Sequence, residues 1–217
     1  MKIFILITGG RTGSGFLHSI LDGHSEICQF PGEFFFDEFF EIARDEKDDQ
    51  KIAKLFCNNY KFFFDSRINK FERFDKLGVN KNEFFKVNKK EFINNFKRLH
   101  SKSSRKKLDL LENLHLAYSK TNKENFKKKK VILLHLHHIF RLPKIQDLNY
   151  EILYTVRDPK TNLSSFFTSW SKYKKKIIDP WSYFFNINRV VNGLNELHSF
   201  KRKIHIIKLE DMHHQNK

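Results

Sequence analysis

A glycine-rich loop close to the N-terminus constrains the fold of this chain more than any other feature. Residues 2–7 read KIFILI, a short apolar run rich in isoleucine that predicts a buried strand. Turn residues from Thr8 to Gly15 follow directly, and the next segment, FLHSIL, carries apolar residues at helical spacing. The loop between such a strand and helix can hold an anion, because its amides point toward the positive end of the helix.

Further apolar segments predict the rest of the sheet. Residues 26–30 predict a short strand, and residues 131–135, 150–156 and 203–209 predict three more, the first two of them followed by helical patterns. Strands that alternate with helices imply a parallel sheet with crossover connections. We therefore expect an α/β fold in three layers, with the parallel sheet between helices.

The middle of the chain, from about residue 34 to residue 130, differs in composition from both ends. Phe, Lys, Asn and Glu dominate it, Pro is absent, and Gly78 is its one glycine. Apolar residues at intervals of three and four predict amphipathic helices whose Phe stripes face a core, in windows 48–63, 83–99 and 107–118. We expect one domain over residues 1–217 that carries this segment as a helical insertion.

Two basic segments, residues 101–107 and 127–130, are predicted to be solvated links. The formal net charge of +16 would suggest a nucleic-acid-binding protein. However, Lys, Asn, Phe and Ile are over-used together, and their codons consist mostly of A and T, so a biased genome explains most of the charge. We expect non-specific attraction of phosphate and sulfate at low salt, and no specific nucleic-acid partner.

The cysteines and the N-terminus bear on the compartment. Cys28 and Cys57 form no CxxC pair and are too few for a disulfide framework. The opening MKIFILITGG has too short an apolar run for a signal peptide, and no segment approaches the roughly 18 apolar residues of a membrane span. These features predict a cytoplasmic protein without a membrane span.

The glycine loop has the glycine spacing of a nucleotide-binding P-loop but lacks two of its residues. Gly10 and Gly15 match the first part of GxxxxGK[ST], whereas Phe16 and Leu17 stand where Lys and Ser or Thr are required. Without that hydroxyl and that lysine, a nucleoside triphosphatase or kinase is disfavoured. Arg11 can supply the positive charge instead. The dinucleotide-binding fingerprint also fails, because His18 stands at its third glycine position.

A second motif lies at the predicted carboxyl end of strand 150–156. Asp158 and Pro159 are typical of a helix start, as cap and first-turn residue. Arg157 is not explained in this way, and it stands where open α/β sheets bind ligands. Its guanidinium suits a phosphate, to which Ser165 can add a hydroxyl.

The two motifs together resemble the donor-binding motifs of the sulfotransferases. GGRTGSGFL is similar to their 5′-phosphosulfate loop, and VRDPK followed by Ser165 is similar to their 3′-phosphate motif, with the family's eight-residue spacing from Arg157. Arg11 in the loop and the RDP sequence are closer to the carbohydrate and tyrosylprotein branches than to the cytosolic phenol and steroid branch. KLEDM at 208–212 resembles the short E-D segment that ends a late strand in this family.

This resemblance implies a fold, a donor and a set of site residues. The fold would be P-loop-NTPase-like, and the enzyme would transfer the sulfuryl group of 3′-phosphoadenosine 5′-phosphosulfate (PAPS) to a hydroxyl or amine without a metal, releasing adenosine 3′,5′-bisphosphate. A carbohydrate or protein side chain would be the acceptor, and the Lys-rich middle segment hints at an anionic carbohydrate. Arg11 would also take part in catalysis. The implied donor-binding residues are Arg11, Thr12, Gly13, Ser14, Gly15, Phe16, Arg157 and Ser165.

The catalytic base has two candidates. Glu33, in QFPGEF, stands where the tyrosylprotein branch carries its proposed catalytic Glu, although it could equally be a loop carboxylate near a helix start. His135 and His137 would share one face of a strand near the place of the catalytic His of the cytosolic branch, but the Lys-Thr-His of that branch is absent. A metal site at His135, His137 and His138 is not expected, because no carboxylate or Cys completes a ligand set.

A different class of function remains as the alternative. Lys-rich helices with interleaved Phe could make a non-catalytic binder of polyanions or nucleic acid. That alternative predicts basic and aromatic residues on one exposed face. The sulfotransferase hypothesis instead predicts that Arg11, Ser14, Arg157 and Ser165 converge on one pocket.

The C-terminus departs from the family pattern. Family members usually continue with a further helical segment after the E-D motif, whereas this chain ends at Lys217, six residues after Asp211. Three explanations are open: a fragment, a truncated gene product, or a minimal form of the domain. In each case we expect donor binding to be weaker than the motifs suggest. Neither the identity of the acceptor nor the oligomeric state follows from the sequence.

Overall fold

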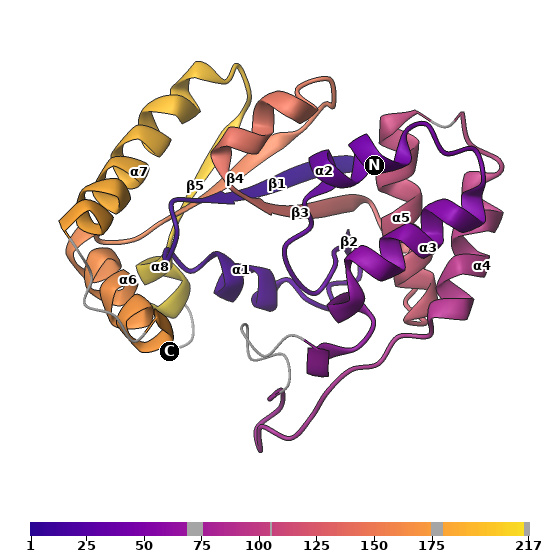
Figure 1. The fold of residues 1–217 in the computed structure, drawn as a ribbon, viewed down its shortest axis with the longest axis horizontal. Helices are drawn as coiled ribbons and strands as arrows, with labels where there is room; N and C mark the ends of the chain where they lie inside the picture. Colours follow the sequence, from indigo (N-terminus) through magenta and orange to yellow (C-terminus); the bar gives the residue numbers. More distant parts are fainter. Residues whose placement is uncertain (69–75, 105, 175–179, 215–217) are drawn as a thin grey trace. The chain divides into compact units, whose positions relative to one another are not determined.

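The apolar segments predicted as strands form a five-stranded parallel sheet with the order β2-β3-β1-β4-β5 (Figure 1). A computed structural model describes residues 1–68, 76–104, 106–174 and 180–214. Helices flank the sheet, so the predicted α/β fold is confirmed. The strands are β1 (Lys2–Thr8), β2 (Ile27–Cys28), β3 (Val131–His137), β4 (Glu151–Val156) and β5 (Ile204–Lys208).

The chain forms two compact units. Unit 1 contains Met1 and residues 23–132, and unit 2 contains residues 2–22 and 133–217. Unit 1 thus includes the whole of the predicted helical insertion, about 34–130, and the eleven residues before it. The description of the chain as one domain with an insertion stays a prediction.

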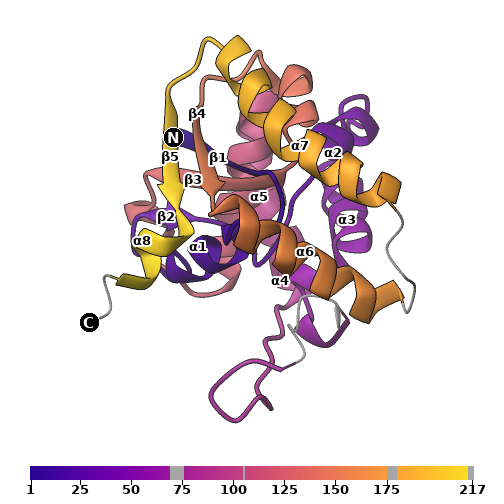
Figure 2. The same cartoon turned by 90° about the vertical axis from the view of Figure 1, so that its left-hand side faces the viewer.

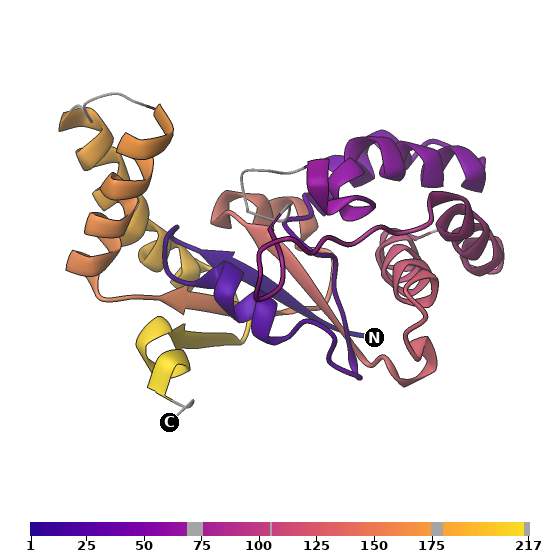
Figure 3. The same cartoon turned by 90° about the horizontal axis from the view of Figure 1, so that it is seen from below.

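Unit 1 is helical, and two of its helices begin where a side chain caps them. Asp48 accepts hydrogen bonds from the first-turn amides of α3, and Asn88 does the same for α4. The predicted window 83–99 therefore becomes helical only after Asn88. Helix α4 packs against both α3 and α5, as Figure 3 shows. The helices are α2 (Phe36–Ala43), α3 (Asp49–Asn59), α4 (Lys89–His100) and α5 (Lys107–Thr121), with 3-10 turns η1 (Lys61–Phe63), η2 (Ser66–Ile68) and η3 (Phe126–Lys128).

Nine phenylalanines of unit 1 form its core, among them residues whose helical spacing predicts this. The ring of Phe30 stacks on that of Phe63 at 4.9 Å between centroids, and Phe56 stacks on Phe92 at 5.3 Å. Such aromatic pairs add to the free energy gained by burying their large apolar area. The fully buried members are Phe30, Phe34, Phe36, Phe39, Phe56, Phe63, Phe64, Phe92 and Phe96.

This core also explains why β2 is shorter than predicted. The sequence predicts a strand over residues 26–30, but the structure has only Ile27–Cys28. Phe30 does not continue the strand, because its ring lies within the aromatic core, 4.2 Å from the ring of His115. Packing in the core therefore overrides the local strand preference of this residue.

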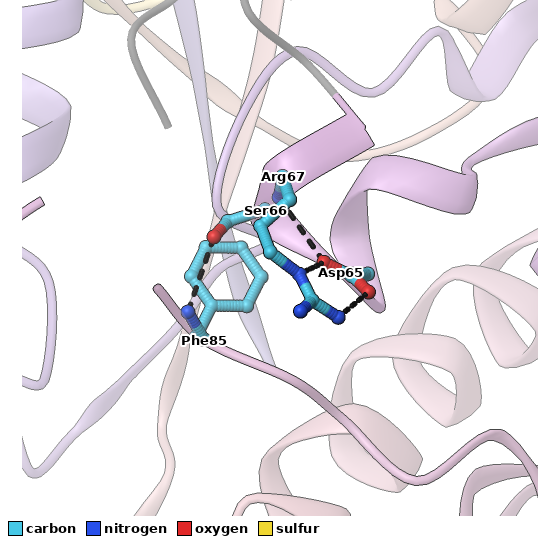
Figure 4. A network of polar contacts seen from close by, with 4 residues as sticks. All are labelled: Asp65, Ser66, Arg67 and Phe85. Carbon is cyan, nitrogen blue, oxygen red and sulfur yellow. Dashed lines mark hydrogen bonds and ion pairs between the residues drawn. The ribbon is translucent and has the colours of Figure 1, made fainter. Parts of the chain in front are cut away.

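A loop in unit 1 is held by a small polar network (Figure 4). Ser66 and Phe85 are joined twice, because Ser66 N donates to Phe85 O and Phe85 N donates to Ser66 Oγ. Arg67 binds both carboxylate oxygens of Asp65, at 2.8 and 2.6 Å. The hydrogen bonds from Arg67 lower the pKa of Asp65 to about 2, so this carboxylate stays charged at any physiological pH.

The basic run 127–130 is not wholly solvated, and for Lys129 that prediction is wrong. The Lys129 side chain is only 2% exposed and forms an ion pair with Glu124. Its ammonium also donates to the carbonyl oxygens of His24 and Ile27, at 2.9 and 2.7 Å. Ile27 belongs to β2 and His24 lies shortly before it, so the buried ammonium of Lys129 gives a hydrogen-bond donor to two carbonyl groups around this short strand.

The other part of the sheet, in unit 2, positions the two sequence motifs. Strand β1 is paired with β4 so that Thr8 lies opposite Thr155, which brings the carboxyl ends of both strands to the same edge. This is the edge at which open α/β sheets bind ligands.

The described helices include none that is both long and apolar enough to cross a membrane. The helices of unit 2 are α1 (Ser14–Ile20), α6 (Pro159–Lys174), α7 (Pro180–Ser199), α8 (Leu209–His214) and the 3-10 helix η4 (Ile139–Ile145).

The buried Lys129 yields a prediction on stability. Replacing Lys129 with Ala should lower the free energy of unfolding by about 3 kcal/mol, because Glu124 and two carbonyl groups lose their shared partner. Lys130→Ala is the matched control, since Lys130 is 71% exposed and its ion pair with Glu26 lies at the surface. Urea denaturation of both variants measures the difference. Equal effects of the two substitutions would contradict the stabilising role assigned to the buried Lys129.

Candidate functional site

The glycine loop turns sharply between β1 and α1. Gly10, Arg11 and Gly13 all have positive φ angles, of 90°, 56° and 88°. Glycine adopts such angles without strain, whereas a residue with a side chain is rarely found there. A non-glycine residue held in this conformation, as Arg11 is here, is common at functional sites.

A chain of buried threonine hydroxyls fixes this loop to the sheet. Thr12 Oγ1 lies 2.5 Å from Thr8 Oγ1 and 2.7 Å from Thr155 Oγ1, so that it bridges the ends of β1 and β4. Thr8 Oγ1 also accepts from Gly10 N at 2.9 Å. The Thr12 side chain therefore points into the protein, and only its backbone is left to contact a donor.

The second motif begins α6 in the way that its sequence predicts. Asp158 caps the helix, since its Oδ1 accepts from Thr161 N at 2.9 Å. This hydrogen bond is the main reason that the pKa of Asp158 lies below its usual value. One helical turn further, Asn162 Nδ2 donates to Gly10 O at 2.9 Å and ties α6 to the glycine loop.

The two motifs meet at Arg11 and Ser165. Arg11 Nε donates to Ser165 Oγ at 3.3 Å, although the residues are 154 positions apart in the sequence. Ser165 also lines an open hollow of about 450 Å³, together with Arg157, Lys160, Thr161 and Ser164. Two cations and three hydroxyls line this hollow, and such a set of donors suits a phosphate group.

Two of these lining residues, Lys160 and Thr161, were not predicted from the sequence, whereas Ser164 and Ser165 were both noted after the Arg157 motif. Lys160 and Thr161 each stand four positions before one of these serines, the spacing of one face of a helix. That spacing could have been used to find them, since the helix start at Asp158 was predicted.

The remaining predicted donor residues lie at the start of α1. The Ser14 side chain is buried, and Gly15 and Phe16 are exposed on the first turn. Ser14 therefore lies in the same loop as Arg11 but is not among the residues that line the hollow. Gly13 stands directly before α1, and having no side chain it could contact a donor only through its backbone.

The candidate bases lie in different units. His135 and His137 lie near the end of β3, next to β1, with their ring centroids 5.6 Å apart. His135 is buried and its ring is 5.2 Å from that of His18 on α1, whereas His137 is half-buried. Glu33 belongs to unit 1, in the loop between β2 and α2, and its side chain is also half-buried.

Comparison with known proteins identifies a family. A family model described as a sulfotransferase domain matches residues 2–215, which is nearly the whole chain. No curated protein and no solved structure shows significant similarity to the chain.

The conformation of the loop yields a second prediction on stability. Gly13→Ala should lower the free energy of unfolding by about 1–2 kcal/mol because of its positive φ, and the new Cβ would lie 2.4 Å from Leu209 Cδ1. Gly15→Ala is the control, because Gly15 has no other atom within 4 Å of a Cβ and lies in α1, where Ala is favoured over Gly. Thermal and urea unfolding should show destabilisation by the first substitution only. A Gly13→Ala protein as stable as Gly15→Ala would contradict this description of the loop.

Proposed function

The chain belongs to the sulfotransferase family, and we propose that it transfers the sulfuryl group of PAPS to a hydroxyl or amine of a carbohydrate or a protein side chain. The hydrogen bond from Arg11 to Ser165 is the observation that carries this proposal. It joins a loop suited to one anionic group with a helix start suited to another. A donor that bears a phosphosulfate at one end and a 3′-phosphate at the other needs such a pair.

The residues present fit the donor at both ends. Arg157 and Ser165, assisted by Lys160, would hold the 3′-phosphate in the hollow at the start of α6. Arg11 and the amides of Gly13–Gly15 would hold the 5′-phosphosulfate. A 3′-phosphate distinguishes this donor from ATP, so these contacts would also supply the specificity.

The proposed chemistry needs positioning and charge neutralisation. Sulfuryl transfer, like phosphoryl transfer, proceeds in line, and negative charge develops on the leaving phosphate. Arg11 stands in the loop that would hold that phosphate, where its guanidinium and the neighbouring amides stabilise the developing charge. The loop lacks the P-loop lysine and the hydroxyl that usually binds Mg²⁺, which supports a mechanism without a metal.

A base must also take the proton of the acceptor. We propose His137 or Glu33 for this role. His137 is favoured by its place at the end of β3, which neighbours β1 at the edge where the glycine loop begins. Glu33 is favoured by the tyrosylprotein-like sequence around it. His135 is buried, and so it suits a supporting role better than direct contact with an acceptor.

The alternative of a polyanion-binding protein is weakened by the core of unit 1. Stacking on nucleic-acid bases requires exposed aromatic rings. The phenylalanines interleaved with lysines in α3 and α4 are fully buried instead, as Phe56, Phe92 and Phe96 show. The lysines of these helices can still attract an anionic acceptor, which keeps an anionic carbohydrate among the proposed substrates.

The cysteines support a cytoplasmic location. Cys28 and Cys57 are free and buried, and burial raises the pKa of each thiol to about 12. Thiols of this kind are inert and form no disulfide framework, as is usual in reducing compartments.

Binding of the product nucleotide tests the proposed donor site. Arg157→Ala should weaken binding of adenosine 3′,5′-bisphosphate about 10- to 100-fold, because a charge-assisted hydrogen bond to a phosphate is lost. Its affinity for adenosine 5′-monophosphate should not change. Arg11→Ala should weaken both ligands. Isothermal titration calorimetry measures all four affinities.

Arg44→Ala is the control for the loss of one positive charge. Arg44 is half-exposed on unit 1 and pairs with Glu41 and Asp45. This variant should bind both nucleotides as the unchanged protein does. If Arg157→Ala and Arg11→Ala also bind the bisphosphate normally, the proposed donor site is wrong.

A second experiment distinguishes the two bases. A panel of carbohydrates and tyrosine peptides, assayed with radiolabelled PAPS, first identifies an acceptor. Glu33→Gln and His137→Gln are then compared, and the variant that lacks the base should lose about 100-fold or more in kcat while donor affinity is unchanged. If neither variant loses activity, both assignments are wrong.

A further inference from the structure

Helix α8 contacts both donor motifs through two consecutive residues. Strand β5 runs directly into α8, which lies beside the start of α1 (Figure 2). Leu209 and Glu210 open this helix. The side chain of Leu209 reaches the glycine loop, and that of Glu210 reaches the turn that begins α6.

Leu209 packs against the glycine loop at Gly13, where the backbone has a positive φ. The Cβ of any residue other than glycine at position 13 would lie 2.4 Å from Leu209 Cδ1 and 3.2 Å from Cγ. Leu209 is itself 9% exposed, so its side chain is covered while it supports the loop. The positive φ of Gly13 and the close contact with Leu209 therefore occur at the same residue.

Glu210 completes the cap of α6. Its Oε1 accepts a hydrogen bond from Asp158 N at 3.0 Å. In a capping box, a Glu or Gln at the third helical position makes this bond, but here that position is Thr161. A residue from another element thus takes the place of the local one. The bond is the main cause of the lowered pKa of Glu210, and the charge of Arg157 adds to it.

This hydrogen bond acts on the orientation of Arg157. The N–H of Asp158 belongs to the peptide group that follows Arg157, so fixing this N–H fixes the plane of that peptide. The direction in which the Arg157 side chain leaves the backbone depends on the same plane. Arg157 lines the hollow and Glu210 does not, so Glu210 affects the shape of the hollow through the orientation of Arg157.

We propose that Leu209 and Glu210 are positioning residues of the donor site, Leu209 for the glycine loop and Glu210 for the Arg157–Asp158 turn. The inference rests on the proposed function, since it assigns the two motifs to the two ends of one donor. Glu210 then controls recognition of the 3′-phosphate, and Leu209 controls binding at the 5′ end.

Four variants test these roles separately. Glu210→Ala should reduce the preference for adenosine 3′,5′-bisphosphate over adenosine 5′-monophosphate about tenfold, because Arg157 is no longer held in place. Glu210→Gln should keep the preference, since its amide oxygen can accept the same hydrogen bond. Leu209→Ala should weaken both ligands equally and leave their ratio unchanged. Asp211→Ala, on the exposed side of the same turn, is the control and should change neither affinity.

A second readout needs no ligand. Amide hydrogen exchange at Asp158, followed by nuclear magnetic resonance, should be faster in Glu210→Ala than in the unchanged protein and in Glu210→Gln. A merely structural effect of the substitution would instead speed exchange throughout unit 2 and lower the unfolding temperature. Circular dichroism of each variant reports the unfolding temperature directly.

The outcomes separate this inference from the proposed function. If the unchanged protein does not prefer the bisphosphate, the proposed function is wrong and the inference falls with it. If the unchanged protein has the preference and Glu210→Ala retains it, only the inference on Glu210 is wrong. Unaltered exchange at Asp158 in Glu210→Ala, or a Glu210→Gln protein that behaves like Glu210→Ala, would also overturn it. A changed ligand ratio in Leu209→Ala would overturn the role of Leu209.

Discussion

The buried hydrogen bond between the hydroxyls of Thr12 and Thr155 is the contact on which the proposed donor site depends. Pairing of β1 with β4 brings Thr8 and Thr155 opposite each other, and Thr12 folds back to bridge them. The glycine loop is thereby fixed to β4, the strand that ends directly before Arg157. In a buried setting such a bond is costly to lose, because the unpaired hydroxyl would be desolvated without compensation.

Much of the site could be predicted from the sequence, because its signals are local. Three residues of the glycine loop have positive φ angles, two of them glycines, and the Asp158-Pro159 pair predicts the start of α6. Short-range rules of backbone conformation and helix capping suffice for both. The α/β fold followed in the same way, from the order of apolar strands and helical patterns.

Lys160 and Thr161 could have been found from helical spacing, but the other features that were missed or wrongly predicted depend on tertiary contacts. Lys129 is buried where its ammonium donates to carbonyl groups about a hundred residues earlier in the chain, although the basic run around it predicts an exposed lysine. Phe30 leaves the predicted strand to join a core made by distant helices. The contact of Glu210 with Asp158 spans 52 positions. No periodicity within either segment reports such partners, and only the sheet brings the last pair together.

The positive charge of the chain is informative by position and not by amount. Of its 41 lysines and arginines, Arg11 and Arg157 carry the proposed function, and Lys129 stabilises unit 1. The central claim is that the two motifs form one site for a nucleotide with a 3′-phosphate. Parallel calorimetric titrations of the unchanged protein with adenosine 3′,5′-bisphosphate and with ATP test it most directly. We predict tighter binding of the bisphosphate, with no requirement for Mg²⁺; a preference for ATP would contradict the account.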